Sequence, residues 1–172
     1  FKRMENYSGG DDEYRGGEGP LNVHRPTPSN PIYQAFLKAG QEAGYPLPDD
    51  ICGYCQEGFG VLDMSIHNGQ RSSTATAYLD PAKNRKNLKI ITKAQVQKIV
   101  LDGITATGVQ YKLANGKVVV ATARREVILS AGAVGSPQLL MLSGIGPELD
   151  LKKLGISIVK NLPGVGQNLI DH

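Results

Sequence analysis

The sequence has no tryptophan and no long apolar run, and its charges nearly balance. A helix that crosses a bilayer needs about 20 consecutive apolar residues, and no stretch approaches that length. No signal peptide is recognisable either. The net charge of +3 is too small to indicate a polyanion as partner. The densest basic stretch, Lys83 to Lys98, alternates with apolar residues and lacks aromatic residues that stack on bases. We therefore interpret it as the solvated face of a strand and expect no nucleic-acid partner.

Cysteine is scarce as well. Cys52 and Cys55 form one C-G-Y-C pair, which cannot complete a tetrahedral zinc site without two further ligands. His67 can supply one of them, but the sequence indicates no fourth ligand. A redox pair is expected at a strand-to-helix junction, whereas this pair sits among Gly and Pro. Incidental thiols, a metal site and a disulfide all stay open; we favour incidental thiols and predict no metal site.

Local signals in the first half predict one long helix between loops. Residues 1–28 are rich in glycine and acidic residues, which is typical of a loop. Ser29 or Asn30 can cap a helix that starts at Pro31, carries apolar residues at helical spacing and ends at Gly44.

Weaker signals follow that helix. Alternating apolar residues predict a strand over residues 61–66, and Asn68-Gly69 predicts a tight turn after it. A Ser- and Thr-rich stretch predicts a short helix over residues 71–79, which ends before Pro81.

The second half changes to strands. Residues 88–102, 106–116 and 117–130 are rich in β-branched residues and are separated by tight turns, which predicts an antiparallel meander. A short helix over residues 147–154, a strand over 156–159 and a glycine-rich loop complete the pattern. Helices and strands together predict a mixed α/β (α+β) fold.

The last strand of the meander runs into a segment with almost no side-chain bulk. The run Val127–Leu129 has the apolar character of a buried strand, and Ser130-Ala131-Gly132-Ala133 then precedes an apolar helix. Small residues let another surface approach the backbone, and free N–H groups at a helix N-terminus favour negative charge. The segment either holds a phosphate-bearing cofactor or lets the helix pack tightly on the sheet. It lacks the G-x-G-x-x-G spacing of the dinucleotide fingerprint, so its spacing does not decide between the two.

Two longer motifs, "GAVGSPQLLMLSGIG" and "LPGVGQNLIDH", occur in succession near the end of the sequence. They resemble the second signature of the glucose–methanol–choline (GMC) oxidoreductases, a family of FAD-dependent alcohol oxidases and dehydrogenases, and the segment that follows that signature. "GQRSSTATAYLDPAKNRKNLKI" resembles the stretch between the substrate and flavin domains. "YRGGEGPLNV", "AGYPLPDDICGYCQEGFG" and "LDMSIHNG" resemble the choline dehydrogenase branch in particular.

The resemblance implies a domain organisation. Residues 1–70 would belong to the substrate-domain and loop region, which lies on an antiparallel sheet in the family. Residues 71–172 would belong to a Rossmann-like FAD-binding domain. The glycine fingerprint and the catalytic His of the family have no match here, and the chain begins with Phe1 and ends directly after "NLID" with His172. We therefore expect an internal segment of a longer enzyme, inactive alone and without a catalytic residue of its own.

The resemblance also implies cofactor contacts. Val96 matches the position whose backbone contacts the adenine of FAD. Ser130, Ala131, Gly132 and Ala133 match the loop near the adenosine and diphosphate. Asn168, Asp171 and His172 match a motif near the flavin. An acid–base dyad of Asp171 with His172 is disfavoured, because neighbours on an extended chain point to opposite sides.

The activity implied is oxidation of a CH–OH donor by hydride transfer to FAD, with choline to betaine aldehyde as the favoured reaction. A quinone or another electron acceptor is implied, and oxygen as the acceptor stays open. Without tryptophan, the chain offers little of the aromatic surface that a quaternary ammonium group calls for. Another alcohol or glucose oxidase or dehydrogenase of the family, and a non-catalytic binding module of the same fold, stay open. For a eukaryotic protein the branch implies the mitochondrial inner membrane, and for a bacterial one the bacterial inner membrane, with an association of the full-length protein with that membrane.

Overall fold

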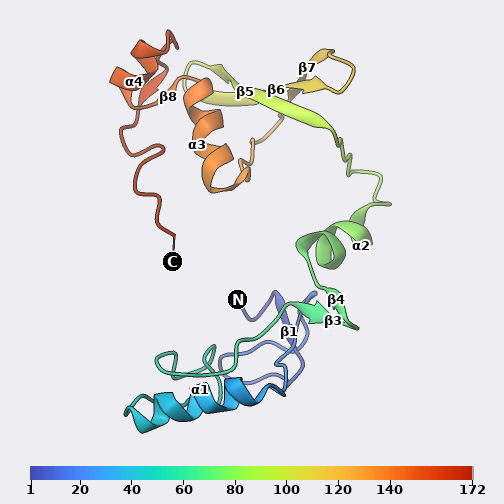
Figure 1. Cartoon of the computed structure of the whole chain (residues 1–172). Coiled ribbons are helices and arrows are strands. Elements are labelled where there is room, and N and C mark those ends of the chain that lie inside the picture. Colours follow the sequence, from blue (N-terminus) through green and yellow to red (C-terminus); the bar gives the residue numbers. More distant parts are fainter. Residues whose placement is uncertain (172) are drawn as a thin grey trace. The chain divides into compact units, whose positions relative to one another are not determined.

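The computed structural model describes residues 1–171 and divides into two compact units, Phe1–Ile90 and the part from Ile91 onward (Figure 1). Both units contain helices and strands, so the predicted mixed α/β class is confirmed. The predicted domain boundary lies between residues 70 and 71, whereas the compact units divide between Ile90 and Ile91. The assignment of either part to a substrate or a flavin domain stays a prediction. Within the described residues, no helix has the length and apolar character needed to cross a membrane.

Helix α1 (Pro31–Glu42) is the longest helix of the first unit, and its ends follow the predicted signals. The Asn30 side chain accepts a hydrogen bond from the Ile32 N–H at 2.9 Å, and Pro31 occupies the first turn. Just beyond the helix, Gly44 adopts φ +87°, a conformation in which glycine carries no steric penalty.

One side of α1 packs on an aromatic cluster. The rings of Phe36 and Tyr45 lie 5.1 and 5.4 Å from the ring of Phe59, centroid to centroid. Gly40 permits this approach, because a Cβ at that position would lie 2.6 Å from the Phe59 ring. The exposed apolar residue Ile32 lies at the start of the same helix.

Short strands hold the rest of this unit. β1 (Glu5–Tyr7) pairs in parallel with β2 (Leu21–Val23), and β3 (Ile66–His67) forms a hairpin with β4 (Gln70–Arg71). The hairpin turns at Asn68 and Gly69, both with positive φ, as the dipeptide predicts. The strand predicted over residues 61–66 is reduced to Ile66 in β3 and an isolated bridge between Met64 and His24. Alternating apolar residues make a strand only where a neighbouring strand accepts the hydrogen bonds.

The short helix after the hairpin does not end before Pro81. A π-helical turn, η1 (Ala75–Leu79), continues into α2 (Asp80–Ala82), and the Asp80 N–H bonds to the Ala75 carbonyl. Pro81 falls in the first turn of α2, where its missing N–H costs little and its fixed φ suits a helix. The predicted end of this helix is therefore wrong.

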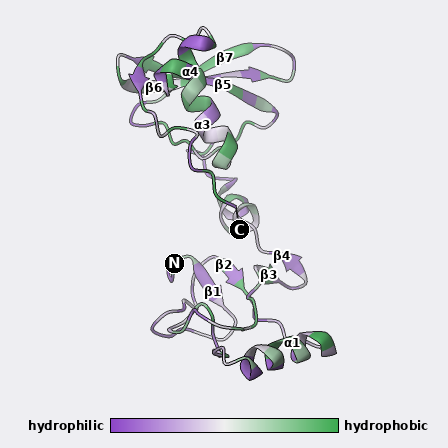
Figure 2. Cartoon of the chain, turned by 60° about the vertical axis from the view of Figure 1, so that its left-hand side comes forward, coloured by the Kyte–Doolittle hydropathy of each residue, from purple (hydrophilic) through white to green (hydrophobic). Residues whose placement is uncertain are grey.

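The second unit is built on the predicted meander. β5 (Ala94–Asp102), β6 (Thr105–Leu113) and β7 (Val118–Thr122) form an antiparallel sheet in the order β5-β6-β7. The first strand starts at Ala94 rather than at residue 88. The register of β5 shifts between Val96 and Lys98. Figure 2 shows a mixture of green, hydrophobic and purple, hydrophilic residues over β6 and α4, whereas purple and pale tones predominate in the loops of residues 1–30.

The third strand ends earlier than predicted. β7 stops at Thr122, residues 127–129 lie outside any strand, and Ile128 is 79% exposed. The interpretation of Val127–Leu129 as a buried strand is therefore wrong for this structure. Its apolar side chains fit a sheet, but no strand among residues 1–171 pairs with them.

Helices follow the meander and pack beside it. α3 (Gly132–Leu142) packs against β5, and α4 (Glu148–Lys153) forms within the predicted helix over residues 147–154 and is followed by Gly155 at φ +69°. β8 (Ile145–Gly146) pairs in parallel with β9 (Lys160–Asn161), so the strand expected over residues 156–159 forms slightly later. Ile99 of β5 and Leu151 of α4 are buried apolar side chains of this unit.

Candidate functional site

The first turn of α3 is bare and open. Ser130, Ala131, Gly132 and Ala133 are all exposed, and a Cβ built on Gly132, at φ +85°, would meet no atom within 4 Å. No side chain caps this helix at its N-cap residue Ala131. The Ala131 N–H itself donates to the Ser136 Oγ at 3.0 Å, which closes the turn from within. The first N–H groups of α3 are thus left uncapped at an open surface, where the helix dipole favours a negatively charged group.

A cavity of about 640 Å³ begins at this turn. Ala133, Val134 and Pro137 of α3 form one wall, and residues 166–170 form the other. Gly166 and Asn168 turn that loop with φ +77° and +56°, in the left-handed region. The walls are largely apolar, with amide side chains as polar groups. Such a lining beside the positive end of a helix suits a flat apolar ligand that carries an anionic group.

Val96, the other predicted cofactor residue, lies near the start of β5. It is 36% exposed, pairs with Tyr111 of β6, and precedes the register shift in β5. A bulge of this kind bends a strand locally and often re-aims the backbone at functional positions. Because α3 packs on β5, the structure places both predicted contact segments on neighbouring elements of one unit.

Ser143 joins those two elements, although it is not among the site residues predicted from the sequence. It is buried, its Oγ accepts a hydrogen bond from the Ile99 N–H of β5 at 2.8 Å, and it donates to the Leu139 carbonyl of α3 at 2.6 Å. The signal was present in the sequence, since Ser143 opens the S-G-I-G of the quoted signature, but a hydrogen bond between distant segments has no local pattern.

A second missed feature is a buried guanidinium in the first unit. The side chain of Arg15 is 1% exposed, although it lies in the glycine-rich segment predicted to be a loop. It donates to both Glu5 carboxylate oxygens at 2.7 and 3.1 Å, to both Asp50 oxygens at 2.9 and 3.0 Å, and to Asp63 Oδ2 at 2.7 Å. The Tyr7 ring lies beside it, with its centroid 3.8 Å from Arg15 Cζ.

Arg25 completes this cluster. It donates to Asp63 Oδ1 at 2.8 Å and to Asp50 Oδ1 at 2.6 Å. Burial alone would raise the pKa of Asp63, but the hydrogen bonds from Arg25 and Arg15 outweigh it and hold that pKa below 3.8. The pKa of Asp50 is lowered too, because the Cys52 N–H and both guanidinium groups outweigh burial. Asp50 and Asp63 are therefore ionised at neutral pH, and the cluster ties three distant stretches of chain together.

Neither cysteine forms a disulfide, and Cys52 lies beside this cluster. Cys52 and Cys55 are free and exposed. Partial desolvation by the surrounding chain, followed by the nearby Asp63 carboxylate, raises the pKa of the Cys52 thiol. The ligand atoms of Asp50, Cys52 and Asp63 lie within 4.8 Å of one another. Both carboxylates already bind guanidinium groups, and a metal ion would have to displace those cations.

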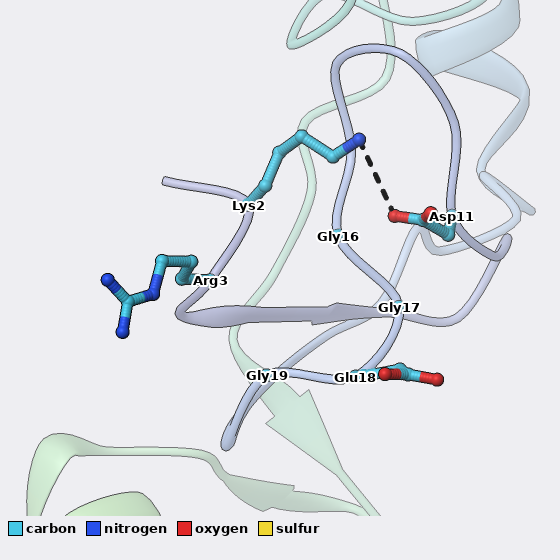
Figure 3. A pocket seen from close by; sticks show the side chains of 7 residues that line it. All are labelled: Lys2, Arg3, Asp11, Gly16, Gly17, Glu18 and Gly19. Atoms are coloured by element: carbon cyan, nitrogen blue, oxygen red, sulfur yellow. Dashed lines mark ion pairs between the residues drawn. The ribbon is translucent and has the colours of Figure 1, made fainter.

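A smaller hollow of about 390 Å³ lies near the N-terminus. Figure 3 shows Lys2 reaching toward Asp11 across a run of glycines, at 3.6 Å between Nζ and Oδ1, while Arg3 points away. The glycines have a packing reason, because a Cβ on Gly16 would lie 2.0 Å from the Lys2 carbonyl oxygen. Charged residues and glycines line this exposed hollow, without the apolar wall and the helix N-terminus found at the cavity beside α3.

Comparison with known proteins decides the family, because the protein-family model described as "GMC oxidoreductase" matches residues 1–172. The chain belongs to the GMC oxidoreductase family. The mitochondrial choline dehydrogenase of Homo sapiens is 53% identical over 172 residues, which are 100% of this chain and 29% of the relative. The oxygen-dependent choline dehydrogenase of Vibrio vulnificus (strain YJ016) is 52% identical over 174 residues, 100% of this chain and 31% of the relative. A solved FAD-dependent oxidoreductase from Chaetomium thermophilum aligns with a TM-score of 0.85 and 30% identity over 95% of this chain and 31% of that one.

The predicted membership of the GMC family is thereby confirmed, and the chain spans less than a third of the length of these GMC relatives. The individual roles of Val96 and of Ser130–Ala133 stay predictions. Asn168, from the motif predicted near the flavin, lines the cavity at α3. His172, from the same motif, lies outside the described residues.

Proposed function

We propose that this chain forms part of the FAD site of an alcohol dehydrogenase, with the adenosine and diphosphate of FAD against β5 and the first turn of α3. The observation that carries the proposal is the uncapped, bare N-terminus of α3 at the mouth of the cavity. Ser130–Ala133 would approach the diphosphate, and the backbone at Val96 would contact the adenine. The solved FAD-dependent oxidoreductase from Chaetomium thermophilum supports FAD as the ligand.

The residues at α3 fit such a group. The exposed turn has no bulky side chain and no acidic residue, and the open space at Gly132 admits a ligand against the backbone. FAD, when bound, supplies the acceptor for the hydride removed from the alcohol carbon. The residues of this chain bind and orient the cofactor, and we assign no catalytic base among residues 1–171.

We further propose choline as the substrate, oxidised to betaine aldehyde with loss of a hydride and a proton. The support is the identity of about half the residues with choline dehydrogenases from an animal and a bacterium. A quinone is the proposed electron acceptor, and the name of the human relative supports mitochondria as the location for a eukaryotic protein.

Oxidation of choline should exceed that of its uncharged isostere 3,3-dimethylbutan-1-ol by at least about tenfold in kcat/KM, since a site for a quaternary ammonium group stabilises the cation. Equal turnover of the two alcohols would refute choline, and assays with a soluble quinone and with O₂ separate the acceptors.

Ala131→Asp in the full-length protein tests the flavin site. The new carboxylate would repel the diphosphate, so flavin content after gel filtration should fall by at least about tenfold. An acidic residue at a helix N-terminus is itself favourable by about 0.3–1 kcal/mol, so the variant should keep its fold. Ala114→Asp adds the same charge at an exposed position after β6 and should retain flavin. Full flavin content in Ala131→Asp would contradict the placement of the diphosphate.

A further inference from the structure

We propose that Ser143 is a positioning residue for FAD. Its hydroxyl fixes α3 to β5 and thereby sets the distance between Val96 and the turn Ser130–Ala133. This inference rests on the proposed function, because it assumes that one FAD molecule contacts both segments. It assigns Ser143 no contact with the cofactor.

The hydroxyl occupies a place where a partner is required. Among residues 1–171, β5 pairs with β6 alone, so its outer edge carries N–H groups that the sheet does not satisfy. The Ile99 N–H is one of them, and Ile99 and Ser143 are each 8% exposed. Ser143 Oγ accepts a hydrogen bond from this N–H at 2.8 Å and donates one to the Leu139 carbonyl at 2.6 Å. A single side chain thus bridges the strand edge and the last turn of the helix.

The chain after Ser143 is held equally closely. Gly144 adopts φ +83°, and a Cβ there would lie 2.4 Å from the Ser157 carbonyl oxygen. Its carbonyl accepts hydrogen bonds from the Val159 and Lys160 N–H groups at 2.8 and 3.1 Å. The corner at the end of α3 is therefore pinned on both sides, and Ser143 provides the bond to the strand that carries Val96.

A small tilt of α3 at Ser143 produces a larger displacement at the first turn of the helix. From Ser143 to Ala131, α3 extends about 18 Å at 1.5 Å per residue, so a tilt of about 5° at Ser143 would move the first turn by about 1.6 Å. Along β5, Val96 lies about 10 Å from Ile99. Displacements of about 1 Å are large for a rigid site that must meet one ligand at two ends.

The test measures FAD affinity and amide exchange in the full-length flavoprotein. FAD is removed, and the apoprotein is titrated with FAD while the flavin fluorescence is followed, for the wild type, Ser143→Ala, Ser143→Cys and Ser143→Thr. Thr107→Val is the matched control, because the Thr107 hydroxyl also donates to β5, at the Val100 carbonyl, but from the neighbouring strand β6. Hydrogen exchange at the Ile99 amide reports the bridge itself, with and without FAD.

Ser143→Ala should raise the dissociation constant of FAD by at least about tenfold, as expected when a buried N–H loses its acceptor and the ligand site shifts. Ser143→Thr, which retains the hydroxyl, and Thr107→Val should each stay within about threefold of the wild type. Exchange at Ile99 should accelerate in Ser143→Ala. If that variant does not fold, Ser143→Cys should show a smaller loss of FAD affinity in the same direction.

Unchanged FAD affinity in Ser143→Ala or Ser143→Cys despite faster Ile99 exchange would overturn the inference and leave the proposed function standing. An equal loss in Thr107→Val would overturn it too, and a wild type that binds no FAD would overturn the proposed function.

Discussion

Replacing Arg15 by Met should unfold much of the segment that it holds. The guanidinium lies among the carboxylates of Glu5, Asp50 and Asp63, of which Asp63 is only 6% exposed. Together with Arg25 the cluster contains three negative and two positive side chains, a balance of −1. Removing Arg15 changes that balance to −2 and leaves the Glu5 carboxylate without its cation.

The magnitude follows from the burial of the cluster. Deleting one partner of a buried ion pair costs about 3–5 kcal/mol, because the remaining charge is desolvated without compensation. Arg15→Lys should cost less but should not be neutral, since an ammonium group cannot present the planar fork that reaches three carboxylates. Lys38→Ala is the control: it removes an exposed pair with Glu42 at 3.6 Å and should cost no more than about 0.5 kcal/mol.

Urea denaturation of the full-length protein, read by hydrogen exchange over residues 1–90, measures these differences. Protection should fall most at the Gly16 amide, which donates to Glu5, and at the Cys52 amide, which donates to Asp50. A cost below about 1 kcal/mol for Arg15→Met would refute the view that this cluster holds the segment, since a solvated surface pair contributes that little.

Three further predictions concern local features. Asn30→Ala should destabilise α1 by about 1 kcal/mol in urea denaturation, because the Ile32 N–H loses its cap; Asn30→Asp should restore it. Gly40→Ala should destabilise despite the better helix propensity of alanine, because the new Cβ would lie 2.6 Å from the Phe59 ring; a gain in melting temperature would contradict this. The depressed pKa values of Asp50 and Asp63 stabilise the fold above about pH 4 and lose that contribution as the pH falls below 3.8. Urea midpoints at pH 7 and pH 3 measure this loss, which should be smaller in Asp63→Asn.

Features encoded by neighbouring residues were predictable from the sequence. The start of α1 at Pro31 depends on the Asn30 cap, and its end depends on Gly44, so a window of a few residues contains all of the information. The same holds for the turn at Asn68-Gly69. The bare turn at Ser130–Ala133 was also recognisable, because it is defined by the side chains that it lacks.

Features that depend on distant partners were not. Arg15 is buried because carboxylates from residues 5, 50 and 63 surround it, and no local sequence pattern indicates that these residues contact one another. Ser143 and Ile99 are separated by 44 positions. The strand prediction for Val127–Leu129 was wrong for a related reason. The composition of this run fits a strand, but a strand also needs a neighbouring strand to pair with.

The Arg15 cluster constrains any attempt to exchange segments between relatives. The glycine-rich stretch of residues 1–28 looks like a portable module, yet its guanidinium groups are neutralised by carboxylates from two other stretches of the chain. A chimera that inherits this stretch without Asp50 and Asp63 would import two cations into a pocket shaped for ion pairs. Recombination sites within residues 1–63 would therefore be tolerated only where both parents supply the matching charges.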